Sequence, residues 1–96
     1  MALSLTQHTL DKLENLLNAL GYRVRYEKGN FKTGTCLIDK NRMIIVNKFS
    51  NLESRISALR DLILQTNADE SGLDEKQAHF LYTLKQTTLQ LWELLF

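Results

Sequence analysis

The chain has 96 residues and a mass of 11.1 kDa, which fits one domain and leaves no room for a second independent core. Its 12 basic and 11 acidic residues leave a net charge of +1, which gives no overall attraction to nucleic acid or membranes. The single cysteine, Cys36, excludes an internal disulfide and a multi-thiolate metal site. No apolar run is long enough to span a membrane, and the first ten residues lack the features of a signal peptide. We therefore expect a single cytoplasmic domain over residues 1–96, with no cofactor and no membrane association.

The first segment, from about Ser4 to Leu20, has the periodicity of an amphipathic helix. Leucines recur on one helical face from Leu10 onward. Ser4, followed three residues later by Gln7, predicts a capping box at the start of this helix. Gly21 suits the position just past its end.

The next segment, Tyr22–Asn47, changes to the period of strands. Apolar and charged residues alternate from Tyr22 to Glu27, whereas Thr35–Ile38 and Met43–Val46 are apolar on both faces. We predict a three-stranded antiparallel meander in which the last two strands form a hairpin. Because two strands are apolar on both faces, we expect helices or a partner to cover more than one side of the sheet.

Two helices follow the strands. The pattern Ser-x-x-Glu beginning at Ser50 predicts a capping box for a helix that ends near Thr66. After a short polar loop, Asp74 with Gln77 predicts the cap of a last helix, which continues to near Leu95. The expected fold is therefore an α+β domain: a helix, the three-stranded meander, and then two helices packed on the sheet.

Residue types that serve catalysis are few and scattered. His8 and His79 are the only histidines, and His79 falls on a polar helix face, where we expect it to be solvated. Cys36 lies in an apolar strand, which favours the role of a small buried side chain. Asp61 is expected on an exposed helix face, and Arg55 should bury its stem and bind a carboxylate or a carbonyl. We predict no catalytic residue, no metal site and no enzymatic activity.

Charge is unevenly distributed along this near-neutral chain. Residues 22–48 contain seven basic and two acidic residues, so five of the 12 basic and nine of the 11 acidic residues lie elsewhere. Basic residues interleaved with aromatic ones are typical of nucleic-acid-binding surfaces. The alternative is a solvated sheet whose charges protect strand edges from unwanted pairing. The candidate residues for binding nucleic acid or an acidic protein are Arg23, Arg25, Lys28, Lys32, Lys40, Arg42 and Lys48.

The last helix carries more apolar surface than one side of a small domain requires. Its apolar arc is roughly twice the stripe of about 100° that a helix packed on one face needs. We predict a homodimer in which a partner helix buries this arc, with Leu91, Trp92 and Leu95 at the interface and Trp92 as the anchor. The alternative is a monomer in which this helix is the central core element, between the sheet and the first helix.

Four stretches between about Leu16 and Leu64 together form a recognisable pattern: Ala19–Tyr26, Gly34–Leu37, Met43–Asn47 and Leu52–Leu59. This pattern resembles that of a family of small zinc metallopeptidases. In that family a helix and a short meander precede a helix that carries the motif His-Glu-x-x-His. The resemblance implies an α+β core of the same kind.

The zinc-binding motif itself is missing. Arg60 and Leu64 stand at the two histidine positions, and Asp61 stands at the glutamate position. Zinc catalysis needs about three protein ligands, so the resemblance implies a non-catalytic relative without zinc. The stretch Gly29–Leu37 also resembles a group of small bacterial proteins with the pattern Gly-Asn-Phe-x-x-Gly-x-Cys-Leu, and this second resemblance implies no activity.

Two functions are therefore expected from the sequence. The first is a non-catalytic, self-associating interaction or structural domain in the cytoplasm. The second is a domain that binds nucleic acid or an acidic partner through the basic sheet segment, residues 22–48.

Overall fold

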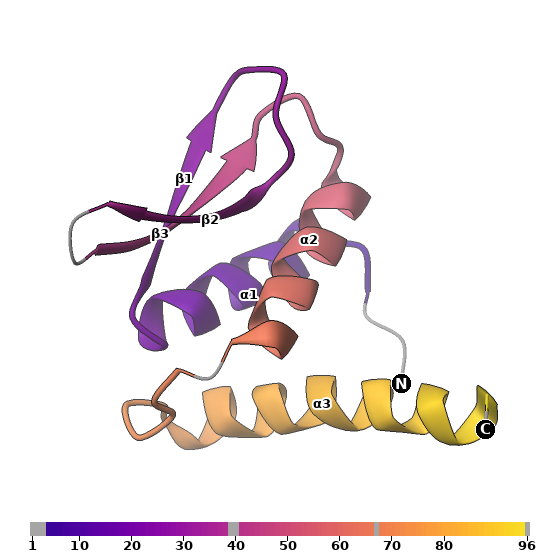
Figure 1. Cartoon of the computed structure of the whole chain (residues 1–96). Helices are drawn as coiled ribbons and strands as arrows, with labels where there is room; N and C mark the ends of the chain where they lie inside the picture. The colour runs from indigo at the N-terminus through magenta and orange to yellow at the C-terminus, as the bar shows by residue number, and fades with distance from the viewer. Residues whose placement is uncertain (1–3, 39–40, 67, 96) are drawn as a thin grey trace.

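The computed structural model of the chain describes residues 4–38, 41–66 and 68–95, with side chains for residues 4–33, 42–66 and 68–86 (Figure 1). It has three helices and three strands in the predicted order, which confirms the α+β class. The elements are α1 (Gln7–Ala19), β1 (Tyr22–Glu27), β2 (Gly34–Ile38), β3 (Asn41–Asn47), α2 (Leu52–Gln65) and α3 (Glu75–Leu95).

Two helices begin later than predicted. The residue that caps α1 is Thr6 rather than Ser4, and the residue that caps α2 is Asn51 rather than Ser50. In both cases the capping side chain accepts a hydrogen bond from the amide three residues further on, and the backbone of the capping residue is extended. Several small polar residues are adjacent at each helix start, and the one directly before the first helical residue is the cap.

The other predicted helix ends are confirmed. The amide of Gln77 donates to Asp74 Oδ1 at 2.8 Å, and the amide of Asp74 donates to Gln77 Oε1 at 3.2 Å, which forms a reciprocal capping box for α3. At the end of α1, Gly21 has a φ of 95°, a conformation that residues with a Cβ rarely adopt.

The sheet is mixed, with the order β1-β3-β2, so the predicted antiparallel meander is wrong. β1 runs parallel to β3, with Val24 opposite Ile44. β2 runs antiparallel to β3, with Cys36 opposite Met43, so the predicted hairpin of the last two strands is confirmed. β3, the last strand along the chain, therefore occupies the centre of the sheet.

The connection between β1 and β2 explains this order. The residues between these strands, 28–33, form a loop (the crossover loop) that passes the end of β3. Two inter-strand spacings amount to about 10 Å, which six residues span easily at about 3.3 Å per residue. A meander needs only a two-residue turn at this point. The apolar patterns do not decide this order, because β2, whose sequence is also apolar on both faces, lies at the other edge of the sheet.

The molecule has three layers: the sheet, then α1 with α2, then α3 (Figure 1). α1 packs on β1, α2 packs on β2 and α1, and α3 packs on α2. The prediction that both C-terminal helices pack on the sheet is therefore wrong for α3. Three strands are about 14 Å wide and helices pack 8–10 Å apart, so one face of the sheet accommodates only two helices. The core contains Leu10, Leu13, Leu16, Leu17, Leu20, Ile44, Val46, Ile56, Leu59, Ile63, Leu81 and Leu84.

Only one face of the sheet is covered by the described helices. Val24 and Ile44 point toward α1 and α2, and the Tyr22 hydroxyl lies 2.7 Å from the Thr66 hydroxyl at the end of α2. On the opposite face, which we call the open face, Arg23 is exposed and its neighbour in register, Met43, is half-buried. The expected cover on more than one side is thus absent from the part of the chain that the structure describes.

Among the described helices, none is both long and apolar enough to cross a membrane.

Candidate interaction surfaces

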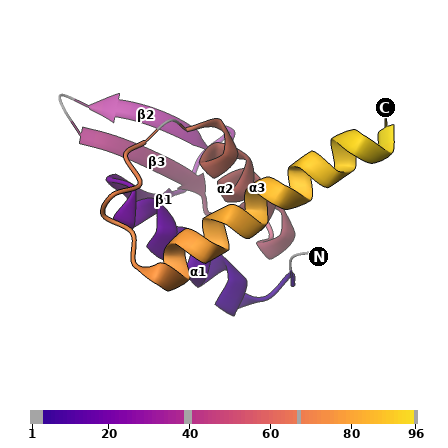
Figure 2. The same ribbon diagram turned by 90° about the horizontal axis from the view of Figure 1, so that it is seen from below.

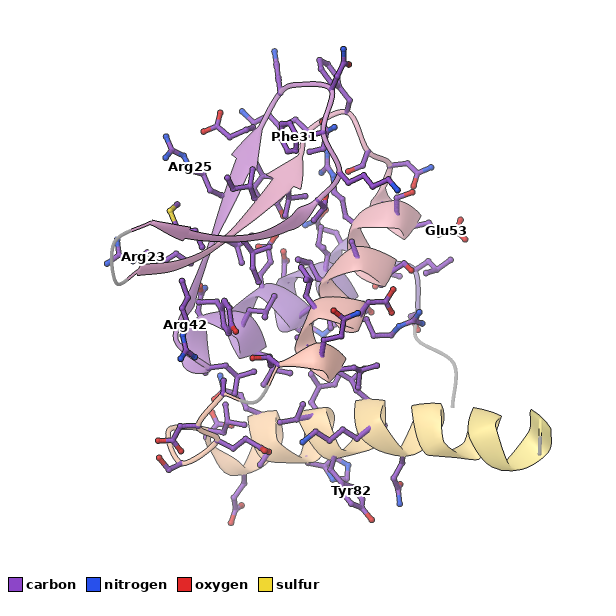
Figure 3. All side chains as sticks on the ribbon, viewed as in Figure 1. Arg23, Arg25, Phe31, Arg42, Glu53 and Tyr82 are labelled. Atoms are coloured by element: carbon purple, nitrogen blue, oxygen red, sulfur yellow. The ribbon has the colours of Figure 1, made fainter. Side chains whose placement is uncertain are left out.

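The predicted polyanion-binding residues do not share one face. Arg23 and Arg25 lie on the open face of β1, where the Arg25 Nε is 2.7 Å from the Glu27 Oε1 (Figure 3). Arg42 is in register with Tyr22 on the opposite face of the sheet, and its guanidinium lies 5.8 Å from the centre of the Tyr22 ring. The arginines are therefore divided between the two faces of the sheet.

Three lysines lie together at the other end of the strands. Lys28 and Lys32 are in the crossover loop, Lys48 directly follows β3, and all three are exposed. They lie at the same end of the sheet because Glu27, which ends β1, pairs in register with Asn47, which ends β3. The remaining candidate, Lys40, lies outside the described residues.

Beside these lysines, a groove of about 400 Å³ runs between the crossover loop and the first turns of α2. Both aromatic residues that line it are exposed to solvent: Phe31 is 37% exposed and Phe49 is 71% exposed. The lining residues are Phe31, Lys32, Thr33, Asn47, Phe49, Ser50, Ser54 and Ala58.

Asn47 holds one wall of the groove in place. Its Nδ2 donates to the carbonyl oxygens of Gly29 at 2.9 Å and Phe31 at 2.7 Å, and its backbone amide donates to Thr33 Oγ1 at 3.2 Å. Its Oδ1 accepts from the amide of Phe49 at 3.0 Å. One side chain at the end of β3 thus fixes the backbone next to both exposed phenylalanines.

The Phe31 ring lies against Gly29. A Cβ added at Gly29 would lie 2.8 Å from two atoms of that ring, so the ring packs on the glycine backbone. A side chain at position 29 would displace this exposed ring from the wall of the groove. The role of Asn47 was not predicted from the sequence. The signal available was a polar amide that directly follows the apolar run of a buried strand.

The third surface belongs to α3. Leu81 and Leu84 are 3% exposed and pack into the core, and Lys12 Nζ of α1 lies 4.3 Å from the centre of the Phe80 ring. Tyr82 is 58% exposed and points away from the rest of the molecule (Figure 3). The alternative in which this helix lies between the sheet and the first helix is wrong, because α1 and α2 separate it from the sheet (Figure 1).

The second half of α3 projects beyond α1 and α2 (Figure 2). The predicted interface residues Leu91, Trp92 and Leu95 belong to this half, and their side chains lie outside the described ones. Their backbone is helical and continues the axis of the packed half. The apolar sequence of residues 91–95 is therefore carried on a helix that leaves the body of the domain.

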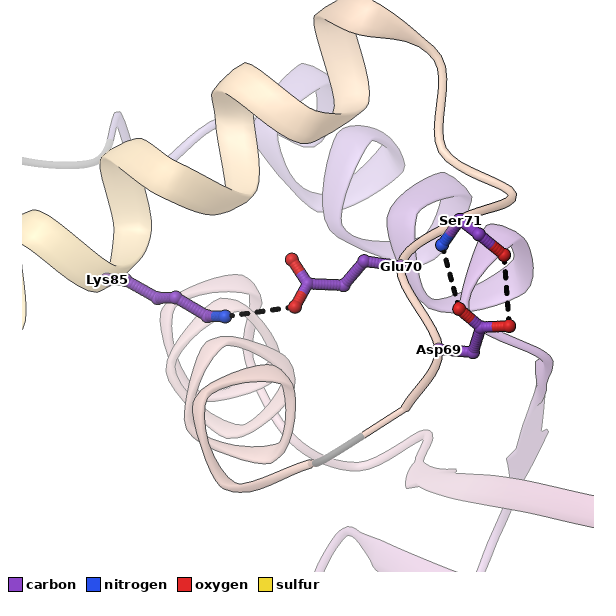
Figure 4. Close-up of polar contacts among 4 residues, drawn as sticks. All are labelled: Asp69, Glu70, Ser71 and Lys85. Atoms are coloured by element: carbon purple, nitrogen blue, oxygen red, sulfur yellow. Dashed lines mark hydrogen bonds and ion pairs between the residues drawn. The ribbon is translucent and has the colours of Figure 1, made fainter.

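The loop before α3 anchors the packed half (Figure 4). Lys85 Nζ lies 3.4 Å from Glu70 Oε2, which links the loop to the helix. In the same loop, Asp69 accepts hydrogen bonds from the amide and the hydroxyl of Ser71, both at 3.0 Å. The amide and then the hydroxyl of Ser71 lower the pKa of Asp69.

The positions that correspond to the zinc motif have other contacts. Arg60 Nη2 lies 3.3 Å from the neighbouring Asp61 Oδ1, and Leu64 packs against the core. His8 and His79 are both exposed and lie on different helices, as predicted for solvated histidines. Across residues 4–38, 41–66 and 68–95, no group of three or more histidine, cysteine, aspartate or glutamate residues is placed to hold a metal ion.

The predicted role of Arg55 is confirmed. Its Nη2 donates to the carbonyl oxygen of Lys48 at 2.8 Å, and its guanidinium lies 5.4 Å from the centre of the Tyr26 ring. Arg55 thus ties the first turn of α2 to the end of β1 and to the segment that follows β3.

Comparison with known proteins found no matching family model, no matching curated protein and no matching solved structure. The three surfaces described above therefore provide the evidence on function.

Proposed function

We propose that this protein is a non-catalytic, cytoplasmic interaction domain that forms a homodimer through the second half of α3. The observation that supports this proposal is the projection of that half beyond the other two helices (Figure 2). Its sequence from Leu91 to Leu95 has four apolar residues in five, including Trp92. Contiguous apolar surface of this kind marks an interface.

A second copy of the chain is the partner best suited to cover the second half of α3. A helix of 21 residues is about 32 Å long, and among its described side chains, which end at residue 86, the buried leucines are Leu81 and Leu84. A helical segment of about ten residues without packing is only marginally stable in water. A two-fold arrangement brings the same half of a second α3 against it and buries both equally.

Sedimentation velocity tests this proposal. We expect a mass near twice 11.1 kDa at micromolar concentrations. Trp92→Glu should shift the folded protein to the monomer, because it places a charge in the apolar interface. Gln90→Glu adds the same charge to the polar side of the same helix, outside the apolar arc, and should leave the dimer intact. A wild-type mass that stays at the monomer value across this concentration range contradicts the proposal.

The other function expected from the sequence was binding of nucleic acid or an acidic partner through the basic segment. This alternative needs a continuous basic surface, but Arg23, Arg25 and Arg42 are divided between the two faces of the sheet. The three lysines beside the groove are the part of the segment that remains together.

A further inference from the structure

We propose that the groove between the crossover loop and α2 binds an acidic peptide segment that carries one large apolar side chain. The groove lies at the end of the molecule where β1 and β3 terminate, whereas α3 lies beyond α1 and α2 on the side away from the sheet (Figure 1). This site is therefore separate from the dimer contact, and either proposal can fail without the other.

The apolar part of the groove needs an apolar ligand. Phe31 and Phe49 line it with 37% and 71% of their surfaces exposed, and Ala58 of α2 contributes to the opposite wall. Large exposed aromatic residues in a concave site are typical anchors of protein interfaces. A volume of about 400 Å³ accommodates one or two side chains of a partner.

The charge around the groove selects an acidic partner. Lys32 lines the groove, and the exposed Lys48 lies between two of its lining residues, Asn47 and Phe49. The exposed Lys28 belongs to the same crossover loop as Lys32. Of the acidic residues nearby, Glu27 is paired with Arg25, which leaves Glu53 as an exposed carboxylate at the start of α2. The positive end of the α2 macrodipole adds to the attraction for carboxylates.

The groove is preorganised for binding. The Asn47 side chain donates to two carbonyl oxygens of the crossover loop, and Gly29 supports the Phe31 ring. A wall that is already ordered loses less conformational entropy when a ligand binds, so a short peptide is sufficient.

The shape of the site favours a peptide over nucleic acid. Single-stranded nucleic acid is bound along an extended basic track with successive stacking rings, over about four or more nucleotides. Here only the lysines lie beside the groove, and Arg23 and Arg25 lie on the open face rather than along it.

The experiment is an NMR titration of the ¹⁵N-labelled full chain. The probes are synthetic twelve-residue peptides in which a central tryptophan, phenylalanine, leucine or methionine is flanked by aspartate and glutamate. Two reference sets replace the central residue with serine or the acidic residues with lysine. We expect at least one acidic peptide with an apolar centre to shift the amide signals of residues 28–33 and 47–58 and to leave those of α3 unchanged. Both reference sets should bind at least about tenfold more weakly, as expected when a dominant contact is removed.

Matched variants assign the contacts. Phe49→Ala removes a highly exposed ring and should weaken peptide binding about tenfold or more. The control Tyr82→Ala removes an exposed ring on α3 and should leave peptide affinity unchanged. Lys32→Glu should weaken binding and reduce its salt dependence, whereas Lys76→Glu in the first turn of α3 should not.

Three results overturn the proposal. The first is that no peptide of the acidic set shifts the groove signals at millimolar concentration. The second is that a twelve-nucleotide oligothymidine shifts them at lower concentration than any peptide, which would assign the groove to nucleic acid. The third is that dilution of the protein alone shifts them and Phe49→Ala abolishes the dimer, which would assign the groove to a second copy.

Discussion

Arg55 and Glu14 form a partly buried charged cluster between α1 and α2. Arg55 Nη2 is satisfied by the Lys48 carbonyl, but its Nε and the Glu14 Oε1 are buried without a hydrogen-bond partner among the described residues. Burial raises the pKa of Glu14, the nearby Asp11 charge raises it further, and Arg55 opposes both effects. The attraction between the two side chains is thus weaker than the desolvation of the carboxylate.

Replacement of Glu14 should therefore stabilise the protein at neutral pH. Because the folded-state pKa of Glu14 is raised, its contribution to stability is fully present below the unfolded value of 4.5 and is lost as the pH rises through the folded pKa. Glu14→Gln removes this loss and should raise the free energy of unfolding at pH 7 by less than about 1 kcal/mol, since partial exposure screens the charge. Urea unfolding at pH 4 and pH 7 measures the difference.

The control for this experiment is Asn15→Gln, which replaces an exposed residue of the same helix without changing a titratable group. Its effect on stability should be similar at both pH values. A wild type that is more stable than Glu14→Gln at pH 7 and loses this advantage at pH 4 would show that the Arg55 attraction outweighs the burial of Glu14.

At the level of elements, the crossover loop is the feature that makes the sheet mixed and builds the groove. The loop passes the end of the central strand, and its backbone carbonyls would remain unpaired there without Asn47. The backbone of Lys48 continues this connection, because its amide donates to the Glu27 carbonyl at 2.9 Å. The end of β3 and Lys48 after it are therefore joined to the crossover loop by side-chain hydrogen bonds and to the end of β1 by a backbone hydrogen bond.

Asn47→Ala should destabilise the fold and loosen the loop. It removes three side-chain hydrogen bonds, two of which satisfy loop carbonyls, so we expect a loss of about 1–3 kcal/mol in the free energy of unfolding. Asn47→Asp should be at least as harmful, because it places a carboxylate against two carbonyl oxygens. Asn30→Ala changes an exposed residue of the same loop and should stay within about 0.5 kcal/mol of wild type. Urea unfolding measures all three, and equal stability of Asn47→Ala and Asn30→Ala would contradict the role given to Asn47.

At the level of the whole molecule, one core joins all three layers while two surfaces remain uncovered. The core continues from the sheet through α1 and α2 to Leu81 and Leu84 of α3. The open face of the sheet and the second half of α3 lie outside this core (Figures 1 and 2). A domain of this size buries about 60–65% of its unfolded surface, so a partner that covers either surface adds appreciably to its stability.

The whole protein should also contain no stoichiometric zinc. Arg60 and Leu64 stand where the resembling metallopeptidases have zinc ligands, and Leu64 packs against the core. Elemental analysis after dialysis against a weak chelator should give far less than one zinc per chain, and a strong chelator should leave the melting temperature unchanged. One retained zinc per chain, with a lower melting temperature after its removal, would contradict this prediction.

The helices and strands of this protein could be predicted from its sequence, because each depends on residues that are close together along the chain. The leucine period of α1, the positive-φ glycine at position 21 and the Asp74–Gln77 cap all depend on residues within a few positions of one another. The structural place of Arg55 also followed from its position at the edge of an apolar stripe. The caps of α1 and α2 were misplaced because adjacent polar residues compete locally for the same role.

Only the tertiary structure decided how these elements pair and which surfaces remain open. Strand order depends on contacts between segments far apart in the chain, and the alternation of β1 is compatible with either neighbour. The groove forms from a loop, a strand end and a helix, so Phe31, Asn47 and Ala58 come together only in the folded domain. The position of α3 depends on the width of the sheet, since three strands accommodate two helices and the third must pack on those.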